Sequence, residues 1–450
     1  MIFDKSWKPF LIVVAIGVAF SSVSAYPPTS RGFGLGSISS PETDPRQVTE
    51  LSTLSTDPVT EWNQHAVMLT LQATPALAPI QQLRVMAIVQ VAVHDAVNGI
   101  TREFETYLSP GTAPQNASAE AAAIAAADQA LRNLFSDQAA TLDDLYLASV
   151  AGHNIADNDP GIAYGRSAAA AILNVRSGDH SAQAQFAYDA PGAGNPGVWV
   201  RLNNAPALLP GWGAVTPFVL RSGSQFRPDA PPALDSKLYA RDYNEIKDIG
   251  VASSSVRTTE QRDIALFWRA SPTAIWNPVL SQVLAARNLD LSATARAFAL
   301  IYLAGSDAGV ACWDAKYSYN FWRPFSAIRG GDSDGNDNTA GDGSWQPLIA
   351  TPPHPEYPSG HSSVSSAMAR VLASIFEDDP GVPISVTLTG ITRNWSSFSE
   401  GVEEVINARV YSGIHFRNSD EVGARMGKQV ARFVFNHALR RCPKGGGGCF

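Results

Sequence analysis

Three short stretches, far apart in the sequence, carry residues able to hold and protonate an oxyanion. They are "KYSYNFWRP" with Lys316 and Arg323, "PSGH" at residues 358–361, and "ARVYSGIH" with Arg409 and His415. Lysine and arginine bind anionic oxygens through charge-assisted hydrogen bonds, and histidine exchanges a proton near neutral pH. Each cation taken alone is more often a solvated salt bridge. Together, the three stretches predict a site for a tetrahedral oxyanion.

The "PSGH" stretch predicts the N-terminus of a helix, because the helix-compatible run "SSVSSAMARVLASIF" follows it. Ser359 is suited to the N-cap position. The Gly360 N–H and the helix dipole favour an anion at this point, and His361 would lie beside that anion as an acid or base. In isolation, such a string is more often a capped helix with a surface histidine.

The spacing in the other two stretches predicts how their residues are presented. Lys316 and Arg323 are seven residues apart, about two helical turns, which places them on one helical face. Gly413 interrupts a helix ahead of His415, and Asn418 with Glu421 is similar to a capping box that restarts it. We therefore expect His415 at a bend.

The combination Lys316-x6-Arg323-Pro324, Pro358-Ser359-Gly360-His361 and Arg409-x5-His415 resembles a known signature. It is shared by vanadium-dependent haloperoxidases and by the type 2 phosphatidic-acid and bacterial acid phosphatases. The stretches "LLPGWGAVTPFVL" and "QFRPDAPPAL" are similar to the secreted haloperoxidase-like members. The resemblance implies an all-α fold of helical bundles with long irregular loops.

The resemblance also implies a role for each matching residue. Vanadate would be the cofactor, held by Lys316, Arg323, Ser359, Gly360, His361 and Arg409, with His415 as the ligand of the metal. His361 and Lys316 would be catalytic, the first as acid or base and the second by polarising peroxide. The implied substrates are hydrogen peroxide and a halide, with room for a small organic acceptor.

Two further residues bear on the choice of halide. His354 precedes His361 by seven residues, where the bromoperoxidase branch has histidine and the chloroperoxidase branch an aromatic residue. By resemblance, His354 is a catalytic residue and favours bromide or iodide over chloride. The alternative is a histidine bonded to backbone or water in a proline-rich loop. Trp313 is similar to a tryptophan of the haloperoxidase pocket, and core packing is an equally good explanation.

The chain departs from the signature at two positions. The family's acidic residue follows the last histidine by four, where this chain has Ser419, with Asp420 one later. Ala408 precedes Arg409 where many members have serine. The shifted carboxylate leaves the partner of His415 open and weakens a phosphatase mechanism with a phosphohistidine on His415. That acid phosphatase remains the alternative function, and a phosphate- or vanadate-binding protein without catalysis is a third.

Helices must position these residues. Apolar or alanine-rich helical periodicity predicts helices in residues 81–100, 117–135 and 292–319, and the chain as a whole reads as all-α. We expect a helical catalytic domain over residues 61–440, as one unit or two packed lobes, with the anion site within 313–420. The net charge of -8 gives no general attraction to nucleic acid. Alanine-rich helix faces would permit a homodimer.

The two ends of the chain have compositions of their own. Residues 1–25 have the basic start, apolar run and small-residue end of a signal peptide, which predicts a secreted or periplasmic protein. Residues 26–60 form a polar arm, and residues 441–450 a tail in which Cys442 and Cys449 are able to close a small loop. Cys312 is expected to be a buried thiol. No later segment is expected to span a membrane.

Two long irregular segments interrupt the helices. Residues 181–235 are rich in proline, glycine and tryptophan, and their length predicts a lid or a wrap between lobes. Residues 330–345 have alternating Asp and Asn like a calcium loop. They lack its glycine at the sixth position and its glutamate at the twelfth, so a turn-rich surface loop is expected.

Overall fold

A computed structural model describes residues 57–443 and Cys449. The expected signal peptide and all but the end of the expected N-terminal arm lie outside the described residues. The α-helices of the described part are α1 Pro58–Gln72, α2 Pro79–Thr101, α3 Ala119–Leu134, α4 Ala139–Gly152, α5 Pro160–Ser177, α6 Lys237–Ile249, α7 Thr259–Phe267, α8 Pro272–Arg287, α9 Leu291–Tyr319, α10 Pro324–Arg329, α11 Gly360–Phe376, α12 Phe398–Tyr411 and α13 Arg417–His437. The fold is therefore all-α, as predicted.

The helices predicted from periodicity are present as α2, α3 and α9, and the helix predicted after "PSGH" is present as α11. Local chemistry fixes their ends. The Asp290 side chain caps α9 by accepting a hydrogen bond from the Ala293 N–H. At the other end of α9, Asn320 adopts a left-handed conformation with φ of 49°, which ends the helix.

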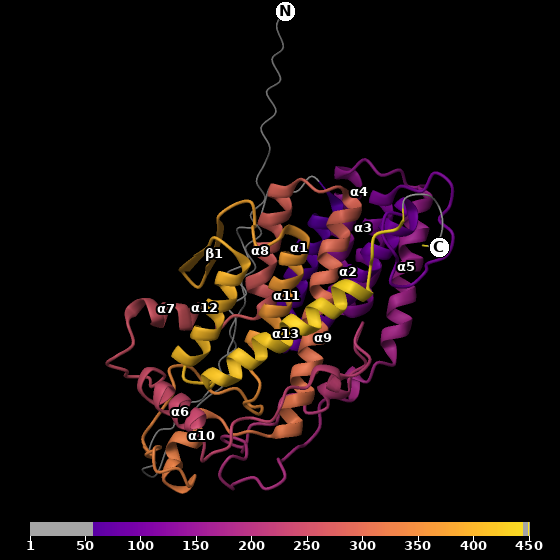
Figure 1. Cartoon of the computed structure of the whole chain (residues 1–450). Coiled ribbons are helices and arrows are strands. Elements are labelled where there is room, and N and C mark those ends of the chain that lie inside the picture. The colour runs from indigo at the N-terminus through magenta and orange to yellow at the C-terminus, as the bar shows by residue number, and fades with distance from the viewer. Residues whose placement is uncertain (1–56, 444–448, 450) are drawn as a thin grey trace, which may run out of the picture. The chain divides into compact units, whose positions relative to one another are not determined.

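The long helices pack in two groups that share one core. In the first, α2, α3 and α5 pack together, and α1 and α4 lie against α3. In the second, α9, α11, α12 and α13 pack together (Figure 1). Helix α2 also packs against α9, so a continuous set of buried side chains runs from the first group into the second.

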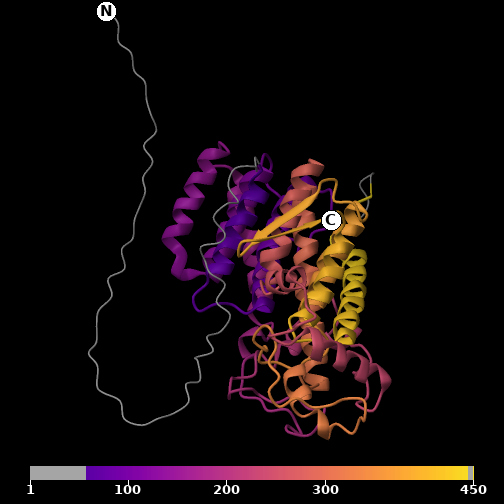
Figure 2. The same cartoon turned by 90° about the vertical axis from the view of Figure 1, so that its left-hand side faces the viewer.

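Irregular segments gather at one end of the long helices, together with α6 and α10 (Figure 2). Between α5 and α6 the chain contains only the short 3-10 helices η3 Ser181–Gln183, η4 Trp212–Ala214 and η5 Gly223–Phe226. Elements η4 and η5 pack on α9. The segment at 330–345 contains η6 Gly331–Ser333 and turns. Its Asp334, Asn336 and Thr339 are buried, so it is less of a surface loop than expected.

One small sheet was not anticipated. Strands β1 Ile384–Leu388 and β2 Ile391–Trp395 form an antiparallel hairpin, in which Ile384 pairs with Trp395. The buried ends of the hairpin pack against α7 and α8. Its β-branched and aromatic residues favour a strand, and the alternating burial of β1 marks the hairpin as half-buried.

Two local expectations near the site are wrong. Lys316 and Arg323 do not share a helical face, because α9 ends at Tyr319 and Arg323 is the extended residue before α10. Asn418 does not cap α13, which begins at Arg417 after Phe416 and has no side-chain cap. The bend before His415 is present, since α12 ends at Tyr411 and Gly413 has a φ of 79°.

Helix α2 is long and apolar enough to cross a membrane, which the sequence reading did not anticipate. In the structure, 89% of its most apolar window is buried against other helices, as is usual for a core helix. Cys312 is a buried free thiol, as expected, and Cys442 is disulfide-bonded to Cys449.

Candidate functional site

Lys316 lies in the last turns of α9 and is completely buried. Its Nζ donates hydrogen bonds to the carbonyl oxygens of Pro355 at 3.0 Å and Glu356 at 2.9 Å. These carbonyls belong to the proline-rich loop that leads into α11, so Lys316 ties this loop to α9. The ring of Trp313, one turn earlier, lies 5.8 Å from Nζ.

Arg323 is a second buried cation and connects three segments of the chain. Its Nε donates to the carbonyl of His354 at 2.9 Å, and its Nη1 donates to the carbonyl of Ile414 at 2.9 Å. The same Nη1 lies 3.2 Å from Nε2 of His415, and Nη2 lies 2.9 Å from Nδ1 of His354. Arg323 therefore contacts both the loop before α11 and the turn before α13.

The start of α11 presents donors that the rest of the described chain leaves free. Ser359 is the N-cap residue, but its side chain makes no capping hydrogen bond. Its buried Oγ has no hydrogen-bond partner of regular distance and angle within residues 57–443. No acceptor within that range takes the Gly360 N–H, which is the usual state of a first-turn N–H without a ligand. Both groups are available to an anion.

His361 follows in the first turn of α11 and is partly buried. Its Nε2 lies 3.1 Å from the carbonyl oxygen of Ala270. A carbonyl only accepts hydrogen bonds, so Nε2 carries the proton and Nδ1 is left as the proton acceptor. The turn between α7 and α8, which holds Ala270, thus fixes the tautomer of His361.

Arg409 is the third buried cation and comes from α12. Its Nη1 donates to the carbonyl of Trp268 at 2.6 Å, in the same turn between α7 and α8. Its buried Nε has no partner among the described residues. Asp420 of α13 is near enough for its charge to affect Arg409, and Asp420 accepts a hydrogen bond from Ser362 at 2.8 Å.

His415 lies at the bend between α12 and α13, and its ring is held from both sides. Nδ1 lies 2.8 Å from Oε1 of Glu356, and Nε2 lies near Arg323. The same Oε1 accepts the N–H of Phe416 at 3.0 Å. Glu356, in the loop before α11, therefore occupies the place beside His415 that neither Ser419 nor Asp420 takes.

Burial shifts the pKa of every ionisable group here. It lowers the pKa of Lys316 to about 8, and those of Arg323 and Arg409 to about 10. Burial raises the pKa of Glu356 to about 7, although Arg323 and Lys316 act in the opposite direction. It also raises the pKa of Asp420 to about 8. At neutral pH the cations therefore outweigh the carboxylates, and the site is suited to an added anion.

The three histidines are neutral at pH 7. Burial is the main cause that lowers the pKa of His354, His361 and His415 well below the usual value, and the neighbouring Arg and Lys side chains lower it further. Each ring therefore offers one nitrogen lone pair. Neutral histidine nitrogen is the form that binds a metal centre.

Comparisons with known proteins agree with this arrangement. Residues 296–443 match the model of the VCPO second helical-bundle domain. The vanadium chloroperoxidase of Curvularia inaequalis is 22% identical over 463 residues, covering 76% of this chain and 75% of its own length. A bacterial vanadium-dependent iodoperoxidase of known crystal structure is 26% identical, with a TM-score of 0.72, over 88% of this chain and all of that one. A holo-type bacterial vanadium-dependent chloroperoxidase matches with a TM-score of 0.66 and 18% identity, over 86% of this chain and 99% of that one.

The chain is thus similar to vanadium haloperoxidases in sequence over residues 296–443 and in fold over most of its length. Its own residues fit the vanadate that this family implies. Ser359 Oγ and Arg409 Nε are buried donors that make no hydrogen bond of regular geometry within residues 57–443, so both are available to the oxygens of an anion. A Cβ on Gly360 would lie 3.3 Å from the Trp313 ring, so the missing side chain keeps the helix N-terminus open.

The residues expected in a vanadium haloperoxidase site come from three stretches of the sequence, and the structure brings them together. His354 also belongs to this group, since it contacts Arg323 and its ring centre lies 4.9 Å from that of Trp313. Trp313 combines both explanations offered above, because it is buried and also borders Lys316 and His354.

Sequence reasoning missed the carbonyl groups of Trp268 and Ala270 and the side chain of Glu356. No sequence signal marks the two carbonyls, because any residue type supplies a carbonyl. Glu356 had a signal, since it is the one acid in the stretch "TPPHPEYPSGHSS" at residues 351–363. A carboxylate in a proline-rich loop beside two histidines is a candidate histidine partner.

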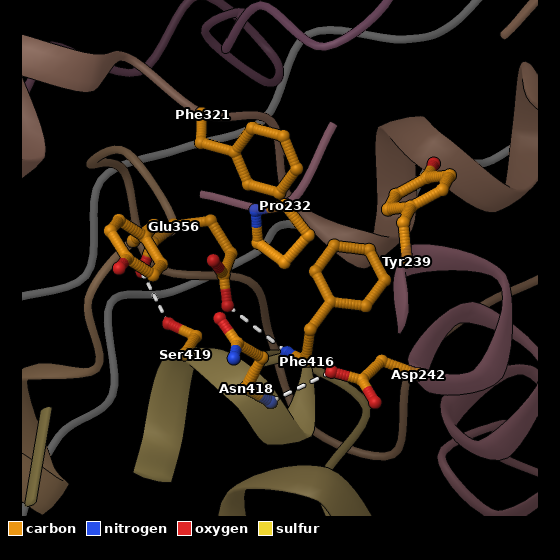
Figure 3. A pocket seen from close by; sticks show the side chains of 9 residues that line it. Pro232, Tyr239, Asp242, Phe321, Glu356, Phe416, Asn418 and Ser419 are labelled. Atoms are coloured by element: carbon orange, nitrogen blue, oxygen red, sulfur yellow. Dashed lines mark hydrogen bonds between the residues drawn. The ribbon is translucent and has the colours of Figure 1, made fainter. Parts of the chain in front are cut away.

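A small cavity lies behind the loop before α11 (Figure 3). Its walls include Glu356 and Ser419, together with the rings of Tyr239, Phe321 and Phe416. Its accessible volume of about 10 Å³ is the room of about one water molecule. It is therefore too small for an organic substrate.

Proposed function

We propose that this protein oxidises a halide with hydrogen peroxide, using vanadate bound by Lys316, Arg323, Ser359, Gly360, Arg409 and His415. The observation that carries the proposal is the convergence of three buried cations on the free N-terminus of α11, with a neutral histidine on either side. Vanadate, when bound, supplies a Lewis-acidic centre that activates peroxide for oxygen transfer to halide.

The chain's own residues divide the remaining work. The three cations balance the charge of the anion, while Ser359 Oγ and the Gly360 N–H donate to its oxygens. His415 offers the Nε2 lone pair for the metal. His361 holds its own proton on Nε2 against the Ala270 carbonyl, so Nδ1 is free to accept a proton during turnover.

We propose bromide or iodide as the preferred halide. His354 supports this choice, since it lies against Trp313 and Arg323 where it borders the anion site. The similar bacterial structure named an iodoperoxidase also supports it. The fungal relative is named a chloroperoxidase, so chloride belongs in the same assay. We also propose export, on the sequence of residues 1–25.

The test is halogenation of a phenol-type dye by the vanadate-free protein with peroxide, before and after addition of orthovanadate. We expect activity only with vanadate, greater with bromide or iodide than with chloride. Lys316→Ala should lower turnover by about 10² to 10³, as removal of one anion-stabilising donor does, while some vanadate binding remains. The exposed Lys237→Ala is the control. Full activity of Lys316→Ala would remove Lys316 from the mechanism.

An acid phosphatase is the second candidate, and one observation favours it. The Glu356 carboxylate on Nδ1 of His415 is the arrangement that a nucleophilic histidine needs. Glu356 thus offers the carboxylate that Ser419, at the usual position of the family's acid, does not offer. Two results together would establish the phosphatase in place of the haloperoxidase. The protein would hydrolyse a chromogenic phosphoester without vanadate, and vanadate would inhibit this hydrolysis. It would oxidise no halide under any condition.

A further inference from the structure

The two neighbours of the His415 ring leave only one arrangement of its proton. Arg323 Nη1, 3.2 Å from Nε2, is a guanidinium nitrogen and only donates hydrogen bonds. Nε2 therefore keeps its lone pair, and the ring proton is on Nδ1. That Nδ1–H donates to Oε1 of Glu356 at 2.8 Å. The contact with Glu356 is thus a true hydrogen bond with a defined direction.

Glu356 is itself fixed on several sides. Its Oε1 also accepts the N–H of Phe416, the residue after His415, at 3.0 Å. Its backbone N–H donates to the carbonyl of Phe321 at 2.9 Å, and its backbone carbonyl accepts from Lys316. The side chain is completely buried. A carboxylate held in this way has little freedom, so it fixes the rotation of the His415 ring as well as its tautomer.

Within residues 57–443, His415 is the one side chain that makes a hydrogen bond of regular geometry to the Glu356 carboxylate, besides the backbone N–H of Phe416. Its second oxygen, Oε2, is buried and has no partner within residues 57–443. The cavity beside Glu356 is lined by aromatic rings and by the polar residues Asp242, Asn418 and Ser419, and it has room for about one water molecule (Figure 3). No Lys or Arg side chain in residues 57–443 forms an ion pair with Glu356.

We propose that Glu356 is the positioning residue of the anion site, which aims the Nε2 lone pair of His415 at the bound oxyanion. It does so from the loop before α11, in a chain where Ser419 stands at the position of the expected acid. This inference rests on the proposed function for the identity of the anion. The orientation of the ring, however, is a property of the protein without vanadate and is measurable there.

The first experiment measures the histidine ring directly. The vanadate-free protein is labelled with ¹⁵N-histidine, and the signal absent from the spectrum of His415→Gln identifies His415 among the eight histidines. We expect a protonated Nδ1 in slow exchange. Glu356→Ala should lose this signal through fast exchange or mixed tautomers. Glu356→Gln retains an acceptor and should keep the signal at a changed shift, because the charge beside the proton is gone.

A matched control separates this effect from general damage. Asp95 is another buried carboxylate, and it accepts the N–H groups of Tyr107 and Leu108 rather than a histidine. Asp95→Asn should leave the His415 signal unchanged. If Glu356→Ala does not fold, Glu356→Gln still decides the matter. An unchanged His415 Nδ1–H shift in Glu356→Gln would overturn the proposal.

The second experiment titrates each variant with orthovanadate and measures the dissociation constant. Loss of an outer-shell partner typically weakens binding by about 10- to 100-fold, which we expect for Glu356→Ala, with a smaller effect for Glu356→Gln and none for Asp95→Asn. Equal affinity in all four proteins, with wild type included, would overturn the proposal. If wild type binds no vanadate, the proposed function fails, and the histidine spectra alone decide the role of Glu356.

Discussion

Neutral buried histidine is the common theme at the scale of single residues. In the anion site, His361 has Nε2 bonded to a backbone carbonyl and Nδ1 free. His415 has Nδ1 bonded to Glu356, and its Nε2 contacts only Arg323, itself a cation of the site. His94 is also buried and neutral, but it lies outside the anion site. It is completely buried in α2, where Nε2 donates to the carbonyl of Glu105 at 3.0 Å and Nδ1 accepts from Asn98 at 3.1 Å. Both nitrogens are used, so His94 is structural.

His94 leads to a prediction about stability and pH. Burial lowers its pKa from 6.5 to about 4, so the unfolded chain takes up this proton before the folded one does. The stabilising effect of His94 is therefore fully present above pH 6.5 and is lost as the pH falls from 6.5 towards 4. Between pH 7.5 and 4, wild type should lose roughly 3 kcal/mol more unfolding free energy than His94→Gln.

Urea unfolding at both pH values measures this difference, and the exposed His180→Gln is the control. A pH dependence of His94→Gln equal to that of wild type would show that His94 does not remain neutral in the folded protein. Other ionisable groups are shared by the two proteins, so their contributions cancel in the comparison.

At the scale of elements, the position of the anion site depends on the contact between α11 and α13. Two glycines of α13 face α11 without a side chain. A Cβ on Gly427 would lie 2.1 Å from the carbonyl oxygen of Ser363, and one on Gly423 would lie 2.7 Å from that of Ser359. The Ser359 N–H also donates to the carbonyl of Ser419 at 3.1 Å. Close approach of α13 therefore sets where the N-terminus of α11 lies.

Gly427→Ala should force the two helices apart. The neighbouring atom is backbone and cannot rotate away, so we expect a loss of about 1–3 kcal/mol in unfolding free energy, together with weaker vanadate binding. Gly343→Ala is the matched control, because a Cβ there meets no atom within 4 Å. Urea unfolding and vanadate titration measure both effects. An unchanged stability of Gly427→Ala would mean that the helices are farther apart than described.

The elements also show what a sequence is able to reveal. Periodicity located α2, α3 and α9, because each is long and apolar or alanine-rich, and the helix-compatible run after "PSGH" located α11. The bend at Gly413 was predicted from one residue type. The shared helical face of Lys316 and Arg323 was not realised, because the left-handed Asn320 ends α9 between them. Spacing alone does not distinguish one long helix from two segments that converge.

The contacts that sequence reasoning missed are tertiary. The turn between α7 and α8 reaches Arg409 and His361 through backbone carbonyls, which have no residue signature. Glu356 reaches His415 across 59 residues of sequence. The partner of His415, left open because Ser419 stands four residues after it, is a carboxylate from a different segment. The motif thus predicted the group of residues, and the packing decided their partners.

At the scale of the whole molecule, the irregular segment between α5 and α6 connects the helix groups with the site. Its Leu208 N–H donates to the carbonyl of Pro353, just before His354, and its Leu208 carbonyl accepts from Trp313 Nε1 at 3.2 Å. Farther along, three consecutive N–H groups, from Phe218 to Leu220, donate to the Asp307 side chain. The segment is therefore bonded to α9 at these two places, as well as through Arg227 to Asp314 and Pro228 to Tyr319. It borders the site at the first of them.

Asp307 leads to the last prediction. Its carboxylate is completely buried in α9 and accepts the N–H groups of residues 218–220 at 2.6, 2.8 and 2.9 Å. Asp307→Ala leaves these donors without an acceptor, which is costly for buried groups, so this part of the segment should open more readily. We expect hydrogen exchange at 218–220 to be at least about tenfold faster, equivalent to about 1.4 kcal/mol of local stability.

Asp95→Ala, the matched control, should instead speed exchange at residues 107 and 108, whose N–H groups donate to Asp95. Because Leu208 keeps its own bonds to Pro353 and Trp313, the vanadate dissociation constant of Asp307→Ala should stay within about threefold of wild type. Faster exchange accompanied by a large loss of vanadate binding would show that the two attachments act as one unit, and unchanged exchange would show that Asp307 does not hold the segment.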